Sequence, residues 1–99
     1  VDPAPAVRGI VLRQNVPNPF NPTTRIDFEL AKRGPVDVSV YNVAGRRVTT
    51  LLSGQLGSGP HSVVWDGRTA SGSVAASGTY WYVVRTPEGK ASRSMVLLK

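Results

Sequence analysis

The feature of this sequence that most constrains its fold is an alternation of apolar and polar residues that Gly and Pro repeatedly interrupt. Ile26, Phe28 and Leu30 alternate with charged residues, and residues 36–41 repeat the pattern with three valines. A period of two places one set of side chains on each face of a β-strand, so we expect half-buried strands. No window sustains apolar residues at the three- and four-residue spacing of a helix. The sequence therefore predicts an all-β chain.

Turn residues divide the chain into about seven such segments, spaced as in antiparallel sandwiches. We therefore expect an immunoglobulin-like antiparallel sandwich of about seven strands, built from two packed sheets. Because the chain has no Cys, the contact between the sheets must be apolar, and aromatic side chains are suited to fill it. The expected core fillers are Phe28, Trp65, Tyr80 and Tyr82. The Gly-rich residues 53–60 are expected to form a loop. The expected strands are residues 10–14, 24–30, 36–41, 46–52, 61–65, 78–85 and 91–98.

Residue counts exclude most catalytic chemistry. The 99 residues contain no Cys and one His, which excludes disulfide scaffolds, thiol nucleophiles and thiolate metal sites. His61 and its neighbour Ser62 point to opposite faces of a strand, so they cannot form a nucleophile–base pair. Asp66 lacks the alternating oxygen ligands of a calcium loop, and we expect it to bond the backbone of a turn in which Gly67 supplies a permissive dihedral. We expect no catalytic residue, no metal and no cofactor in this chain.

A formal net charge of +6 leaves three interpretations open. The basic residues form a solvated outer face, attract an anionic surface or bind nucleic acid. They are scattered along the chain without a basic helix or a known binding motif, so no nucleic acid partner is expected. No apolar run approaches the ~18 residues of a membrane span, so no transmembrane segment is expected either.

The two ends of the chain differ in character. Residues 1–9 carry Pro3 and Pro5 and have little to bury, which is typical of an extended linker. The chain begins with Val1 rather than Met, as expected of a segment of a longer polypeptide. Residues 95–99 are mostly apolar and then stop, as expected of a true C-terminus. Residues 10–99 are therefore expected to form one domain.

Residues 15–24 form the least generic segment, in which three Pro and three Asn surround Phe20. Each Pro removes a ladder donor, so the segment cannot be a central strand, and Asn side chains favour turns. We expect Phe20 to plug one end of the sandwich. The other ordered motifs are VYNVAGRRV (40–48), HSVVWDG (61–67), SGTYWY (77–82) and MVLLK (95–99). The residues expected to carry these motifs are Asn18, Pro19, Phe20, Asn21, Pro22, Gly45, Trp65, Asp66, Gly67, Gly78, Tyr80 and Tyr82.

These ordered motifs, which cover residues 11–99, resemble the C-terminal sorting domains of type IX (Por) secretion substrates and the related Ig-like domain of flagellar hook-capping proteins. The resemblance implies that residues 10–99 are a non-catalytic C-terminal sorting and attachment domain of a larger secreted protein. Such domains are recognised by secretion-machinery proteins at the Gram-negative outer membrane and are commonly cleaved off. The passenger, often a glycoside hydrolase, a protease or an adhesin, stays on the outer cell surface. Many members carry Asp or Asn after the Trp-Asp-Gly motif, but residues 68–71 here do not, which weakens a calcium loop.

The resemblance implies recognition through the last strands, here residues 78–99. The expected partner-contacting residues are Trp81, Arg85, Lys90, Arg93 and Lys99, and the expected partners are secretion-machinery or outer-membrane proteins, with an anionic cell-surface polysaccharide as a further candidate. If Tyr80 and Tyr82 face inward, Trp81 points outward with Val83 and Arg85. There it can stack on a sugar or dock on a protein, unless a neighbouring strand or the Arg85 stem covers it. The alternative functions are a carbohydrate-binding module that uses Trp81 and a tyrosine, and a structural Ig-like spacer or docking domain.

Overall fold

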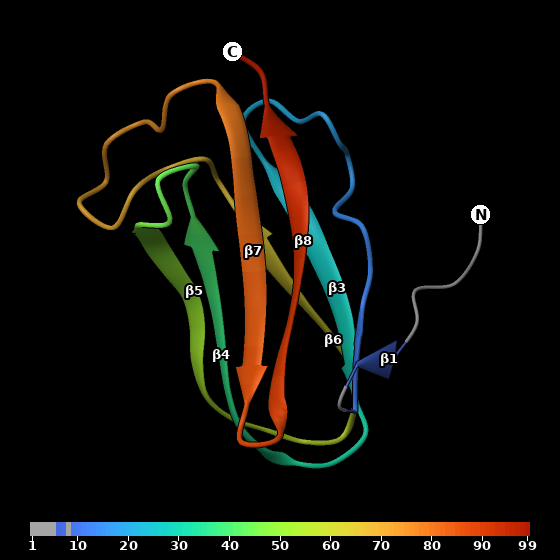
Figure 1. The fold of residues 1–99 in the computed structure, drawn as a ribbon. Helices are drawn as coiled ribbons and strands as arrows, with labels where there is room; N and C mark the ends of the chain where they lie inside the picture. The colour runs from blue at the N-terminus through green and yellow to red at the C-terminus, as the bar shows by residue number, and fades with distance from the viewer. Residues whose placement is uncertain (1–5, 8) are drawn as a thin grey trace.

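Two antiparallel sheets pack face to face in this protein (Figure 1). The structure is a computed structural model that describes residues 6–7 and 9–99. One sheet has the strand order β1–β2–β3–β6 and the other β5–β4–β7–β8. This arrangement confirms the predicted immunoglobulin-like sandwich. The strands of the described residues are β1 (Ala6–Val7), β2 (Ile10–Leu12), β3 (Thr24–Leu30), β4 (Gly34–Tyr41), β5 (Arg47–Leu56), β6 (Gly59–Trp65), β7 (Gly78–Thr86) and β8 (Gly89–Leu97).

The strands that period-two alternation predicts are present. The prediction that residues 53–60 form a loop is wrong. β5 continues through Leu56, and β6 begins at Gly59. The reason is tertiary pairing, because the start of β4 provides ladder partners for residues 54–56 and overrides the loop preference of Gly. Most of the expected linker, residues 1–9, lies outside the described residues. Within it, Ala6–Val7 pair with the start of β2 as the short strand β1.

The core lies between the inner faces of the two sheets. Ile26, Phe28 and Leu30 of β3 are buried there and face the three buried valines of β4, Val36, Val38 and Val40. The four expected aromatic fillers are also buried, each worth roughly 1.5–3 kcal/mol of stability. They are Phe28, Trp65, Tyr80 and Tyr82.

A cluster of three aromatic rings closes one end of the core. The Trp65 ring lies 5.7 Å from that of Phe20 and 5.2 Å from that of Tyr80, measured between centroids. Phe20 is fully buried and plugs this end of the sandwich, as the motif predicted. The polar atoms of the cluster are also bonded, since Trp65 Nε1 donates to the Arg68 carbonyl at 2.9 Å and Tyr80 Oη to the Ala76 carbonyl at 2.7 Å. The cluster therefore fixes both the segment before β3 and the loop after β6.

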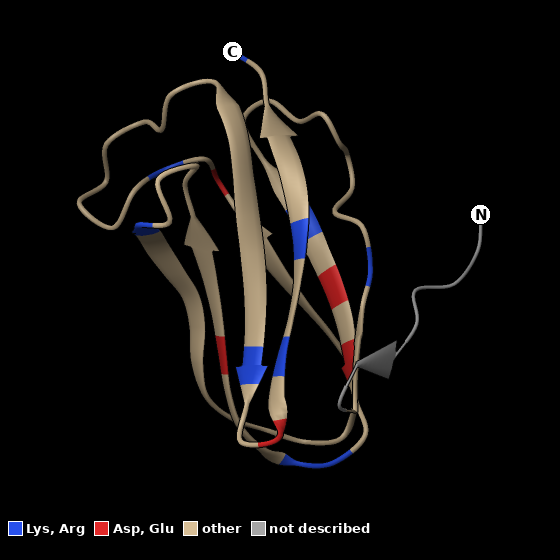
Figure 2. Cartoon of the chain, viewed as in Figure 1, with Lys and Arg blue, Asp and Glu red and all other residues tan. Residues whose placement is uncertain are grey.

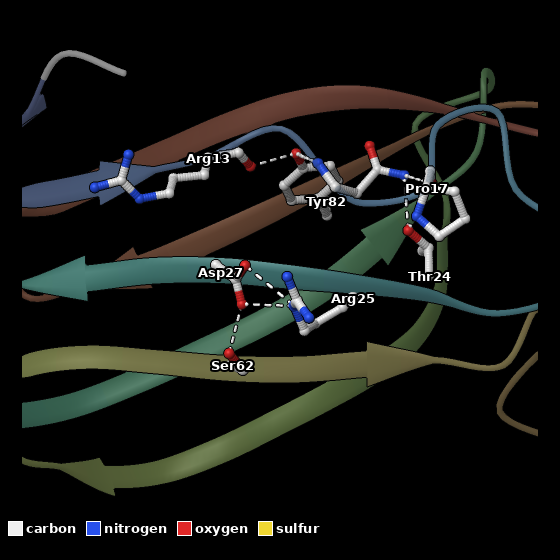
Figure 3. A network of polar contacts seen from close by, with 8 residues as sticks. Arg13, Pro17, Thr24, Arg25, Asp27, Ser62 and Tyr82 are labelled. Carbon is white, nitrogen blue, oxygen red and sulfur yellow. Dashed lines mark hydrogen bonds and ion pairs between the residues drawn. The ribbon is translucent and has the colours of Figure 1, made fainter. Parts of the chain in front are cut away.

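The Pro- and Asn-rich segment, residues 15–24, is anchored by a buried hydrogen-bond network around Tyr82 (Figure 3). The Asn15 backbone N–H donates to Tyr82 Oη at 2.9 Å, and Tyr82 Oη donates to the Arg13 carbonyl at 2.7 Å. Asn15 is only 2% exposed, and its Nδ2 donates to the Pro17 carbonyl and to Thr24 Oγ1. Burial raises the pKa of the Tyr82 phenol to about 12. Such a satisfied buried network specifies one placement of the segment.

From this anchor the segment runs along the outer edge of β8. The Phe20 N–H donates to the Val96 carbonyl at 3.0 Å, and the Leu98 N–H donates back to the Phe20 carbonyl at 2.9 Å. The Val96 N–H donates to Asn18 Oδ1, and Gln14 Nε2 donates to the Ser94 carbonyl. β8 is an edge strand of its sheet, and unpaired edges invite pairing with other chains. Residues 14–20 therefore cover the C-terminal half of this edge.

The Trp-Asp-Gly turn packs against the same segment. Asp66 Oδ1 accepts the Arg68 N–H at 3.1 Å, and the Gly67 carbonyl accepts the Ala75 N–H at 2.8 Å. Gly67 has φ +76°, and a Cβ placed on it would lie 2.8 Å from the carbonyl oxygen of Pro22. The turn thus requires Gly for its dihedral and for the close approach of the neighbouring backbone. Figure 1 shows that this loop, the segment before β3 and the C-terminus lie at the same end of the sandwich.

Substitution of this glycine tests the close approach. We expect Gly67→Ala to lower the free energy of unfolding by clearly more than Gly45→Ala. Both glycines have φ near +77°, but a Cβ on Gly45 meets nothing within 4 Å. The Gly45 variant therefore measures the dihedral cost alone, about 1–2 kcal/mol, and urea unfolding compares the two. Equal losses would show that Pro22 does not constrain the turn.

Candidate functional site

Some of the residues predicted to contact a partner lie together on one surface, formed by β4, β7 and β8. Tyr80, Tyr82 and Val84 of β7 point into the core, so the alternate residues of this strand point away from it. Strand register places side chains of β4 and β8 beside them on the same face. We call this surface the outer face; its residues are Asp37, Ser39 and Tyr41 of β4, Trp81, Val83 and Arg85 of β7, and Lys90, Ser92 and Ser94 of β8.

Trp81, Arg85 and Lys90 lie together on the outer face, whereas Arg93 and Lys99 do not. Arg93 alternates with the exposed positions of β8, and its Nε donates to the Leu12 carbonyl at 2.6 Å across the gap between the sheets. Lys99 lies at the chain end, where its backbone N–H donates to Ser77 Oγ. Figure 2 shows basic residues along β7 and β8. Only the first three residues therefore share one surface.

A shallow hollow lies in the outer face beside Trp81. Trp81 is 37% exposed, and Val83 next to it is only 8% exposed, although it points to the same side. The hollow has a volume of about 350 Å³. It is lined by Tyr41, Trp81, Val83, Arg85 and Ser92 of the strands and by Asn42, Val43 and Gly45 of the turn after β4.

Arg85 and Tyr41 form the polar part of the hollow. Arg85 Nη2 donates to Tyr41 Oη at 3.1 Å, and the Arg85 guanidinium carbon lies 5.6 Å from the centroid of the Tyr41 ring. The hydrogen bond from Arg85 lowers the pKa of the Tyr41 phenol below its ordinary value. Burial opposes this shift, and Arg47 on the neighbouring strand adds to the lowering. Two guanidinium groups therefore act on one phenol oxygen at this surface.

Several polar groups at the hollow have no bonding partner among residues 6–7 and 9–99. Asn42 Oδ1 accepts the N–H groups of Ala44 and Arg46, which holds the turn and leaves its Nδ2 unpartnered. Trp81 Nε1 and Ser92 Oγ are also unpartnered in the described part of the chain. The hollow thus combines two aromatic rings, one guanidinium and several free hydrogen-bonding groups.

The side chains that could take part in catalysis or metal binding are hydrogen-bonded within the fold. His61 Nε2 lies 2.7 Å from the Gly57 carbonyl and its ring contacts that of Phe28, whereas Ser62 Oγ donates to Asp27 on the opposite face (Figure 3). Asp27 also accepts a hydrogen bond from Arg25. The described residues contain no group of three or more His, Cys, Asp or Glu side chains that could hold a metal ion. The outer face is therefore the candidate functional site.

Sequence reasoning missed Tyr41 and Asn42 at this site. Alternation places Tyr41 on the polar face of its strand, but the residue joins Trp81 only because β4 pairs with β7. Two complete strands, β5 and β6, lie between Tyr41 and Trp81 in the sequence, so no local pattern relates these two residues. The Arg93 position could have been read from the sequence, since it alternates in phase with the apolar residues Met95 and Leu97.

A model of the FlgD Ig-like domain family matches residues 15–90, more than half of the chain. The chain belongs to this family. The match includes the Pro- and Asn-rich segment and the outer-face residues Trp81, Arg85 and Lys90. It agrees with the resemblance noted from the sequence motifs. A comparison with curated proteins finds no match.

Solved structures with this fold include three bacterial proteins. Dimeric latent PorU from Porphyromonas gingivalis matches with a TM-score of 0.70 and 22% identity, over 90% of this chain and 9% of PorU. PorZ of the same organism, described as an essential surface component of the type-IX secretion system, has a TM-score of 0.60 and 22% identity, over 87% of this chain and 11% of PorZ. FlgD from P. aeruginosa has a TM-score of 0.60 and 28% identity, over 75% of this chain and 58% of FlgD.

The chain thus corresponds to a small part of PorU and PorZ and to 58% of FlgD. It is an Ig-like module, and the FlgD-type Ig-like domain is a non-catalytic structural fold. No helix of the described residues is long and apolar enough to cross a membrane.

The contact between Arg85 and Tyr41 can be tested by titration. We expect Arg85→Gln to raise the pKa of the Tyr41 phenol, because the hydrogen bond from Arg85 is the largest cause of its lowered value. The ring carbon resonances of Tyr41, followed by NMR as a function of pH, report this pKa. Lys90→Gln removes a charge from the same face and is expected to change the Tyr41 pKa much less. An unchanged pKa in the Arg85 variant would contradict the contact.

Proposed function

We propose that this chain is a sorting and attachment module of a larger secreted protein, which it directs to the outer surface of a Gram-negative bacterium. Membership in the FlgD Ig-like family and the likeness to PorU and PorZ support a module associated with secretion. The residues that recognise the partner are Trp81, Arg85 and Lys90 on the outer face. The activity of the larger protein belongs to its other domains.

One observation carries this proposal: the last two strands present an uncovered face, whereas the C-terminal half of the β8 edge is already bonded to residues 14–20. Residues 14–20 bond the edge of β8 at Ser94, Val96 and Leu98, so a partner cannot add a strand there without displacing them. The exposed Trp81 and the basic Arg85 and Lys90 remain accessible on the outer face. Aromatic and Arg side chains are the types that most often dominate the binding energy of a docking surface.

Surface display of a fusion protein tests the proposal. A reporter fused ahead of residues 1–99 is expected to reach the cell surface in a host with a type IX system and to remain there. The double variant Trp81→Ala/Arg85→Gln is expected to reduce surface-bound reporter about tenfold or more, since each removed anchor is worth ~1–2 kcal/mol. Cell-surface immunolabelling, normalised to total reporter, measures the effect.

A matched control changes one exposed apolar and one exposed basic residue elsewhere. Val64→Ala/Lys32→Gln alters Val64 on β6, which is 58% exposed, and Lys32 in the turn after β3. This variant is expected to be displayed like the unmodified fusion. Display without residues 1–99 would contradict the sorting function. Full display of the folded Trp81/Arg85 variant would show that the outer face is not the docking surface.

A further inference from the structure

The hollow of the outer face has two aromatic walls of different strands. Trp81 of β7 and Tyr41 of β4 are directly opposite each other in the register, so their side chains are neighbours on the same side of the sheet. Both line the hollow, whose volume of about 350 Å³ lies within the range of small-ligand sites. Aromatic rings present a flat apolar surface with a polar group at the edge. Such a surface suits the C–H face of a pyranose ring.

The charge at the hollow is positive. Arg85 lies in its wall, and none of the residues that line it is acidic. The guanidinium has five N–H donors, and its one protein hydrogen bond among the described residues goes to Tyr41. Asp37 is opposite Arg85 in the register, but its carboxylate accepts from Ser39 Oγ, while the Arg85 guanidinium reaches Tyr41. The free N–H groups of Arg85 can therefore donate hydrogen bonds to both oxygens of a carboxylate.

The remaining groups favour a saccharide over a protein partner. Asn42 Nδ2, Trp81 Nε1 and Ser92 Oγ are free to bond hydroxyl groups in the described structure. Ser92 and Ser94 of β8 border the aromatic pair, and Ser is depleted in protein–protein interfaces, where apolar side chains form the centre. Sugar hydroxyls, in contrast, match a rim of short polar side chains. The combination of flat rings, one guanidinium and free polar groups therefore favours an acidic sugar.

We propose that this hollow binds an acidic hexose of a cell-surface polysaccharide, with the sugar ring stacked on Trp81 and its carboxylate bonded to Arg85. Tyr41 orients the guanidinium and forms the second wall, while Asn42 and Ser92 bond the hydroxyl groups. This inference rests on the proposed attachment function in that it names the surface ligand of the same face. In this proposal the hollow binds a sugar during attachment to the cell surface, and export depends on contacts outside the hollow.

Calorimetric titration of the full 99-residue chain with a galacturonic acid trimer tests the site. We expect saturable binding, with at least tenfold weaker binding of the neutral galactose trimer because that ligand lacks the carboxylate. Trp81→Ala is expected to weaken binding of both trimers by tenfold or more. Arg85→Gln is expected to abolish the preference for the acidic trimer, whereas the control Val64→Ala/Lys32→Gln leaves both affinities unchanged.

Polyglutamate serves as an anion without a sugar ring. If it binds as tightly as the acidic trimer and Trp81→Ala has no effect, the contact is general charge attraction and the proposal is overturned. Absence of saccharide binding while the fusion is still displayed through Trp81 and Arg85 would overturn the sugar site and leave the attachment function, with a protein as the partner. Saccharide binding without display of the fusion would overturn the attachment function and leave the sugar site.

Discussion

The fold depends most on the hydrogen bonds of one buried hydroxyl, that of Tyr82. It accepts from the Asn15 backbone and donates to the Arg13 carbonyl, so a residue in the centre of one sheet fixes the chain where it leaves the other. From there residues 15–20 reach β8, where Phe20 exchanges backbone hydrogen bonds with Val96 and Leu98. Leaving such buried groups unpaired costs roughly 1–3 kcal/mol each, so the segment has one favourable path. The Pro residues supply no ladder donors along this path. Asn15 Nδ2 donates to the Pro17 carbonyl and Thr24 Oγ1 within the segment, and Asn18 Oδ1 accepts the Val96 N–H of β8.

This anchoring determines which surface of the last two strands is available. The C-terminal half of the β8 edge is bonded to residues 14–20, and Arg93 is held by the Leu12 carbonyl between the sheets. What remains accessible is the outer face, where β4 contributes Tyr41 beside Trp81 and Arg85. A rigid sheet holds these side chains at fixed spacing, which lowers the entropy lost when a ligand binds. The buried motif residues Phe20, Trp65 and Tyr82 thus have structural roles. Tyr41 and Trp81 belong to the same motifs but lie on the outer face.

Much of the fold follows from the sequence because period two relates each residue to its own strand. The buried sets of β3 and β4, the inward Tyr80 and Tyr82, and the outward Trp81 could all be predicted in this way. The extension of β5 and β6 into residues 53–60 could not, because β5 there pairs with the start of β4 and β6 with the end of β3. For the same reason the hollow was only half predicted: Trp81 and Arg85 came from alternation, whereas Tyr41 came from a pairing between distant strands. The closure of the β8 edge by the Pro- and Asn-rich segment also had no local signal.

Native-state amide hydrogen exchange of the Tyr82→Phe variant tests the central claim most directly. Phe keeps the ring in the core and removes only the hydroxyl that bonds Asn15 and Arg13. The account predicts that the Phe20 and Leu98 amides, well protected in the unmodified protein, lose protection together by a factor of about ten or more. The Val84 amide, in the centre of the same sheet, should change only as much as the global stability does. Unchanged protection at Phe20 and Leu98 relative to Val84 would show that the segment is held on β8 without Tyr82 and would contradict the account.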